Sequence, residues 1–106
     1  MATKQELRDA FQRQGNAMAR CCSDGAAPVA PECMGLRGRR AQIASRVSAW
    51  NALPAESSSF DAAIGALNGS AAQLEAAGND QQCRAAITAG HGALDRLEQL
   101  LDGAGQ

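Results

Sequence analysis

The stretch RCCSDGAAPVAPEC, residues 20–33, holds three of the four cysteines in a chain of 106 residues. Its Ser-Asp-Gly tripeptide is typical of a helix end, because glycine readily adopts the left-handed conformation that closes helices. Two prolines follow, and proline disfavours a helix interior because it lacks the backbone N–H. The stretch therefore predicts the end of one helix and a loop over residues 23–36, longer than the usual helix–helix connection of about 2 to 8 residues.

On either side of this loop, apolar residues recur with the 3.6-residue period of amphipathic helices. The pattern predicts helices over residues 4–22, 37–52, 59–77 and 80–101. Their apolar faces comprise, in chain order, Leu7, Phe11, Met18 and Cys22; Leu36, Ile43, Val47 and Trp50; Phe60, Ile64, Leu67, Ala71 and Leu74; and Cys83, Ile87, Leu94, Leu97 and Leu101. This arrangement indicates an all-α fold, a single antiparallel up-down four-helix bundle that occupies residues 1–106 as one domain.

Residues suited to helix N-caps precede three of the predicted helices. They are Thr3 with Glu6, Ser58 with Asp61, and either Asn79 or Asp80. Gly90 lies within the apolar face of the last helix. A glycine there is compatible with close approach of another helix or with simple tolerance of a weak helix former.

The composition limits both the core and the classes of partner. Alanine makes up about a quarter of the chain, several times its usual share, whereas the aromatic residues are only Phe11, Trp50 and Phe60. Alanine favours helices but buries little apolar area, so the predicted core is thin. The formal net charge of −1 argues against a dedicated binder of nucleic acid or anionic membranes. No stretch approaches the roughly 20 consecutive apolar residues of a transmembrane helix.

The predicted topology brings all four cysteines to one end of the bundle. Cys21 and Cys22 end the first helix, Cys33 lies in the loop and Cys83 begins the fourth helix. An even number of cysteines in a small domain with a thin core is typical of disulfides, which would staple the loop. Because adjacent cysteines rarely bond to each other, Cys21 and Cys22 each pair with Cys33 or Cys83, and the assignment stays open.

Other chemistry of these residues is disfavoured. Structural zinc sites normally use Cys-x2–4-Cys pairs, which are absent, and the only histidine, His91, lies two turns after Cys83. No Cys-x-x-Cys motif indicates a redox-active thiol. Asp95 and Glu98 share a helix face and are interpreted as surface ion-pairing groups. No catalytic residue, metal or cofactor is predicted.

The predicted disulfides indicate an oxidising compartment, so the protein is expected in the periplasm or outside the cell. The N-terminal segment lacks the apolar core of a signal peptide, so a removed leader is assumed, and whether Met1 is native stays open. Nine of the ten basic residues are arginine, which, with abundant alanine and glycine, favours a bacterial GC-rich genome. The alternative is a cytoplasmic protein with reduced thiols.

These observations favour a non-enzymatic protein–protein interaction module, with the partner and the oligomeric state left open. Long ordered loops on rigid scaffolds often carry binding residues, which places the surface on the loop and the start of the second helix. The candidate residues are Val29, Glu32, Met34, Arg37, Arg39 and Arg40. The alternatives are a cytosolic adaptor, chaperone or immunity-type protein and, least favoured, a nucleic-acid binder that uses the arginine cluster.

Overall fold

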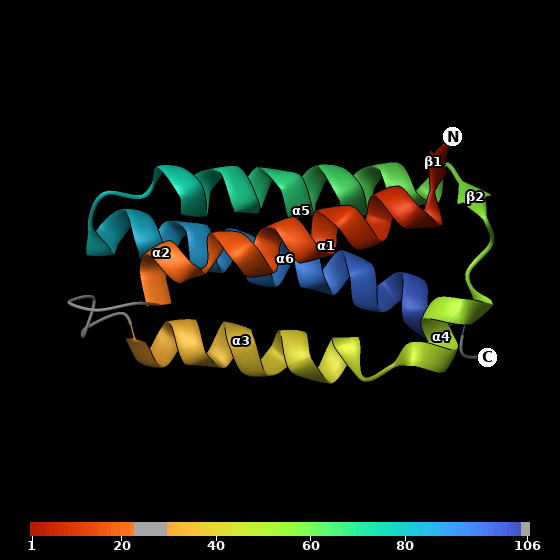
Figure 1. Ribbon diagram of the computed structural model, residues 1–106, viewed down its shortest axis with the longest axis horizontal. Helices are drawn as coiled ribbons and strands as arrows, with labels where there is room; N and C mark the ends of the chain where they lie inside the picture. Colours follow the sequence, from red (N-terminus) through yellow and green to blue (C-terminus); the bar gives the residue numbers. More distant parts are fainter. Residues whose placement is uncertain (23–29, 105–106) are drawn as a thin grey trace.

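Four long helices lie side by side along the longest dimension of the molecule in the computed structural model, which describes residues 1–22 and 30–104 (Figure 1). The principal dimensions are 41 × 23 × 17 Å. The helical segments are α1 (Lys4–Ala17), α2 (Ala19–Cys22), α3 (Ala30–Ala44), α4 (Val47–Ala52), α5 (Ser59–Ala76) and α6 (Asp80–Ala104). The predicted all-helical character is confirmed, and α6 extends beyond its predicted end at residue 101.

A short strand pair was not predicted. Strands β1 (Ala2–Thr3) and β2 (Glu56–Ser57) pair antiparallel, with Ala2 opposite Ser57. Two residues are too few to show the alternation that marks a strand in a sequence. The pairing ties the N-terminus to the segment that leads into α5 (Figure 1).

The apolar core lies where α5 packs against α1 and α6. Phe60, Leu67 and Leu74 of α5 and Leu94 of α6 are completely buried, as their predicted apolar faces require. Ile64, which was predicted on the same face of α5, is only partly buried. Regular apolar spacing therefore located most of this core.

Helix α3 begins at Ala30, well before the predicted start at residue 37. The prolines suggested a loop, but Pro31 lies in the first turn of α3, where a backbone N–H is not needed for helical hydrogen bonding. Cys33 consequently belongs to a helix, and the predicted loop over residues 30–36 is wrong. The remaining part of that loop, residues 23–29, lies outside the described residues.

The predicted helix over residues 37–52 is broken after Ala44. Arg46 leaves the helical conformation, with φ −84° and ψ 53°, and α4 then starts in a new direction (Figure 1). The break turns Val47 outward, so this residue is 58% exposed and its predicted place in the core is wrong. Trp50 stays buried, and its indole N–H donates to the Ile43 carbonyl at 3.4 Å.

The predicted first helix is interrupted only slightly at Met18. The Met18 N–H is shared between the carbonyls of Gln14 and Gly15, at 3.2 and 3.3 Å, and α2 resumes at the next residue. The chain direction is therefore kept. Cys21 becomes completely buried, while Cys22 is partly exposed.

Two of the three predicted N-caps are confirmed. Thr3 and Glu6 form the capping box, with the Thr3 hydroxyl accepting from the Glu6 N–H at 3.1 Å. The Asn79 side chain accepts from a backbone N–H in the first turn of α6 at 2.8 Å. The capping box at Ser58 is wrong: its side chain makes no capping hydrogen bond, and the neighbouring Ser57 hydroxyl accepts from the first N–H of α5.

Candidate functional site

The four cysteines meet in two pairs at one end of the molecule. Cys21 lies at bonding distance from Cys83, with the Cα atoms 5.7 Å apart, and Cys22 from Cys33, at 5.6 Å. Both separations fall within the range of about 4.4–6.8 Å that disulfides require. The first pair joins α2 to α6 and the second joins α2 to α3. The structure thereby assigns the pairing that the sequence left open.

The predicted binding surface is only partly gathered beside these cysteines. Glu32, Met34 and Arg37 are exposed on α3, with Met34 at 57%. Val29 lies outside the described residues. Next to this surface is a groove of about 340 Å³ between α3 and α6. Its lining residues are Glu32, Gly35, Arg84, Ile87, Thr88 and His91.

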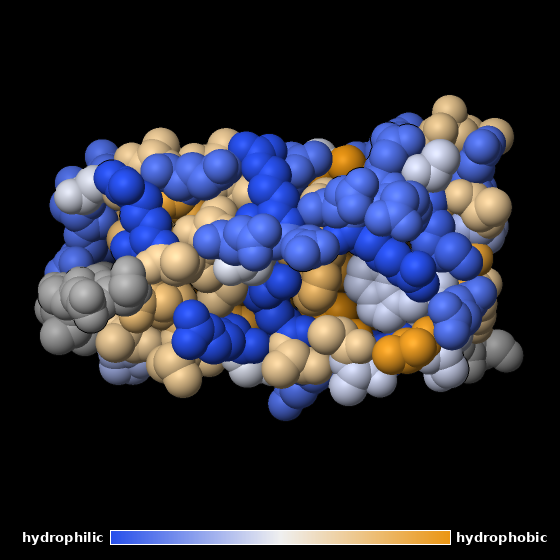
Figure 2. All heavy atoms as spheres, viewed as in Figure 1, coloured by the Kyte–Doolittle hydropathy of each residue, from blue (hydrophilic) through white to orange (hydrophobic). Residues whose placement is uncertain are grey.

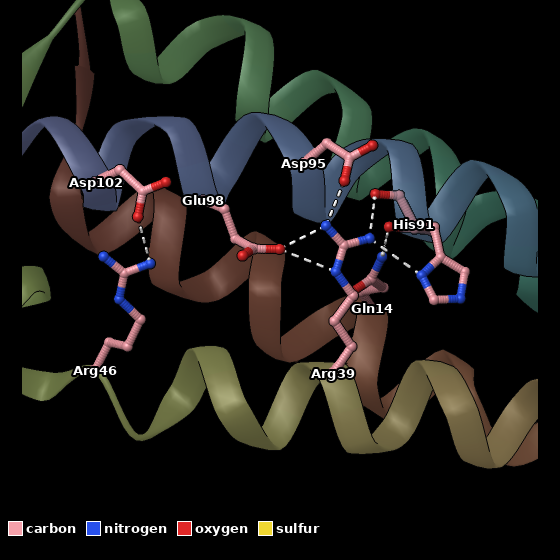
Figure 3. Close-up of polar contacts among 8 residues, drawn as sticks. Gln14, Arg39, Arg46, His91, Asp95, Glu98 and Asp102 are labelled. Carbon is pink, nitrogen blue, oxygen red and sulfur yellow. Dashed lines mark hydrogen bonds and ion pairs between the residues drawn. The ribbon is translucent and has the colours of Figure 1, made fainter.

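Arg39 faces α6 rather than solvent (Figure 3). Its guanidinium donates to the Glu98 carboxylate at 2.9 Å, to the Asp95 carboxylate and to the His91 carbonyl at 3.0 Å. Burial alone would lower the pKa of Arg39, but the hydrogen bonds and charges of the two carboxylates outweigh it and raise this pKa. Asp95 and Glu98 are therefore ion-pairing groups, as predicted, and their partner comes from a different helix.

Arg40 faces α1. Its guanidinium carbon lies 3.8 Å from the ring centroid of Phe11, and it donates to the Gln14 side-chain carbonyl at 2.6 Å. Burial lowers the pKa of Arg40 to about 10, so the group is still charged at neutral pH. Because Arg39 and Arg40 both contact other helices, only Arg37 of the predicted arginine cluster extends freely into solvent.

Gln14 forms the centre of a buried polar network that the sequence analysis missed. Its amide nitrogen donates to the Ser70 hydroxyl at 2.9 Å and to the Gly90 carbonyl at 3.4 Å. Together with Arg40, these bonds connect α1, α3, α5 and α6. No buried side-chain nitrogen or oxygen of the described residues lacks a hydrogen-bond partner. The sequence does hold one sign that Gln14 is buried: it lies two helical turns after Leu7, and therefore on the apolar face of the same helix.

Gly90 permits this close packing. A Cβ atom at this position would lie 3.0 Å from the Leu36 side chain and 3.3 Å from the Gln14 amide nitrogen. Both distances are tighter than ordinary contacts. Of the two interpretations of Gly90, the structure supports close approach of neighbouring helices.

A second surface lies between α1 and the α3–α4 region, and we call it the aromatic groove. It encloses about 300 Å³ and is lined by Arg8, Phe11, Ala44, Val47 and Trp50. The Phe11 and Trp50 rings meet edge to face, with centroids 5.7 Å apart, and the Arg8 guanidinium lies 5.7 Å from the Trp50 ring. Figure 2 shows hydrophilic surface over α1 bordering apolar surface near α4.

The side of the aromatic groove formed by α1 is basic. Arg8 donates to the Asn51 side-chain carbonyl at 3.3 Å, and Lys4 donates to the Leu53 carbonyl at 3.2 Å. The lining residues include no carboxylate. The groove thus combines apolar surface with cationic groups, an arrangement that can bind but that holds no acid–base pair for catalysis.

The described residues show neither a group of three or more His, Cys, Asp and Glu side chains able to hold a metal ion nor a helix suited to crossing a bilayer. No family model matches the chain, and searches of curated proteins and solved structures found no match. The two surfaces themselves are therefore the features from which a function can be inferred.

Proposed function

We propose that this chain is a small exported bacterial protein that binds another protein and catalyses no reaction. We take its long helices to form an up-down four-helix bundle, and both cysteine pairs to be oxidised in the mature protein. The observation that carries the proposal is the placement of both pairs at one end, beside exposed Glu32 and Met34. A cross-linked surface loses little conformational entropy on binding, which favours its use for recognition.

The compartment is tested by the oxidation state of the cysteines. Protein matured in the periplasm is alkylated with and without prior reduction, and its intact mass is measured. We expect alkylation only after reduction, because stable disulfides persist in oxidising compartments. Four alkylated cysteines without reductant would instead favour a cytosolic adaptor, chaperone or immunity-type protein.

Binding is tested by photo-crosslinking in the native host. A photoreactive amino acid replaces Met34, which is exposed beside the cysteines, or Gln73, which is exposed on α5. We expect a defined protein adduct from position 34 and none from position 73, with the adduct abolished by reduction of the disulfides. The same adducts from both positions, or no adduct from position 34, would contradict a recognition surface on α3.

A further inference from the structure

We propose that the aromatic groove is a separate binding site for an acidic peptide segment that carries an apolar side chain. The groove involves Arg8, Phe11, Val47 and Trp50 on α1 and α4, whereas the surface of the proposed function lies on α3 beside the cysteines. The inference therefore goes beyond the proposed function and can fail or succeed independently of it.

The apolar part of the site combines an exposed aliphatic side chain with an aromatic lining. Large apolar side chains are mostly withdrawn from water, yet Val47 is 58% exposed at the edge of the groove. Phe11 is partly exposed beside it and, with Trp50, provides an aromatic lining. A volume of about 300 Å³ is at the lower end of the range for ligand sites. It suits one or two side chains of a peptide rather than a folded domain.

The charged part selects the sign of the ligand. Among the described residues, no carboxylate forms an ion pair with Lys4, Arg8 or Arg40. Lys4 and Arg8 lie one helical turn apart on α1, so their positive charges face the same side. An aspartate or glutamate next to the bound apolar side chain would complete a charge-assisted hydrogen bond with Arg8.

The rings are poorly arranged for nucleic acid. Proteins that bind single strands present aromatic faces on which bases stack. Trp50 is only 6% exposed, and Phe11 already packs against it edge to face while Arg40 covers the Phe11 ring. Neither ring therefore presents an open face of the size of a base. An aliphatic side chain needs no such face.

Trp50 is the only tryptophan in the chain, so its fluorescence reports directly on the groove. The probe is a short peptide in which glutamate and leucine alternate, without aromatic residues. Two matched peptides replace glutamate by lysine or leucine by serine. We expect a saturable change in Trp50 emission with the glutamate–leucine peptide, weakened by salt, and no saturable change with the other two.

Variants of two exposed residues test the site without disturbing the core. Arg8→Glu and Val47→Asp are expected to weaken binding of the glutamate–leucine peptide by about tenfold or more, as the loss of one charge-assisted or apolar contact implies. The control is Arg96→Glu, which changes an exposed arginine on α6 outside the groove lining and is expected to leave binding unchanged. Circular dichroism melting confirms that each variant is folded.

Four binding results would overturn the inference. They are no saturable response to the glutamate–leucine peptide, equal binding of the lysine–leucine peptide, unchanged binding by Arg8→Glu, or tighter binding of a single-stranded DNA oligonucleotide. A concentration-dependent dimer in sedimentation that Val47→Asp abolishes would likewise overturn it, because a second copy of the chain would then occupy the groove. The crosslinking result at position 34 is independent of all these outcomes.

Discussion

Helices α5 and α3 are of similar length but are held in the molecule by different interactions. Helix α5 buries a mostly apolar row that packs against α1 and α6. Helix α3 buries only Cys33, Leu36 and Ile43. The apolar contribution to stability scales with buried area, so α5 gains far more from burial than α3 does.

Polar contacts and a cysteine pair compensate for the smaller buried area of α3. Arg39 of α3 forms ion pairs with Asp95 and Glu98 of α6, and Arg46, in the turn that follows α3, pairs with Asp102 of α6 at 2.8 Å (Figure 3). Arg40 contacts α1, and the Cys22–Cys33 pair joins α3 to α2. Since exposed ion pairs contribute little each, α3 depends on the cysteine pair much more than α5 does.

The largest effects are expected from removing the cysteine pairs. Replacing both Cys21 and Cys83 by serine should lower the free energy of unfolding by about 4 kcal/mol, and replacing Cys22 and Cys33 by about 3 kcal/mol, because the second pair closes a shorter loop. Urea unfolding measures both. Hydrogen exchange should show that loss of the Cys22–Cys33 pair selectively exposes the amides of α3. If the amides of α5 and α3 exchanged equally faster in this variant, then α3 would not depend on the Cys22–Cys33 pair more than α5 does.

The next effect concerns the apolar core. Leu67→Ala on α5 should destabilise the protein by about 3 kcal/mol, because it removes a completely buried side chain and leaves a cavity. The matched change Val47→Ala on α4 removes an exposed side chain and should stay within about 0.5 kcal/mol. Thermal and urea unfolding give both values. Similar losses for the two variants would contradict the assignment of the core to α1, α5 and α6.

The contrast between α5 and α3 also explains how far the sequence could predict the fold. Helices α5 and α6 were located well, because apolar residues such as Phe60 and Leu94 recur at a regular spacing. The limits of α3 and the break at Arg46 were missed, because the apolar face of α3 is weak. Pro31 marks a loop and a first helical turn equally well, and only the folded environment selects between them.

The candidate site was predictable only where the order of the helices determines it. The clustering of four cysteines followed from topology, whereas the pairing of Cys21 and Cys22 depends on the exact rotation of α2. The partners of Arg39 and Arg40 are more than twenty residues away in the sequence, so no local pattern shows that these side chains face inward. Phe11 and Trp50 likewise form one groove only after α4 turns away from α3.

A smaller effect is expected at the buried polar network. Gln14→Ala should lower the free energy of unfolding by about 2 kcal/mol, because Arg40 and the Gly90 carbonyl each lose a buried hydrogen-bond partner. The exposed neighbour Gln12 is the control, and Gln12→Ala should have almost no effect. Chemical unfolding of the two variants side by side provides the measurement. A negligible loss for Gln14→Ala would mean that the network does not connect α3 to the other helices.

The smallest effect tests the ionic contribution to α3 directly. Arg39→Gln should cost about 1 kcal/mol at low salt, because Arg39 contacts two carboxylates of α6 yet remains partly exposed to solvent. Raising the salt concentration should reduce the difference in unfolding free energy between Arg39→Gln and the unmodified protein, since salt screens exposed charges. Arg37→Gln, on the solvent side of the same helix, should show neither effect. If the two variants unfold alike at every salt concentration, then the ion pairs of Arg39 do not help to hold α3 against α6.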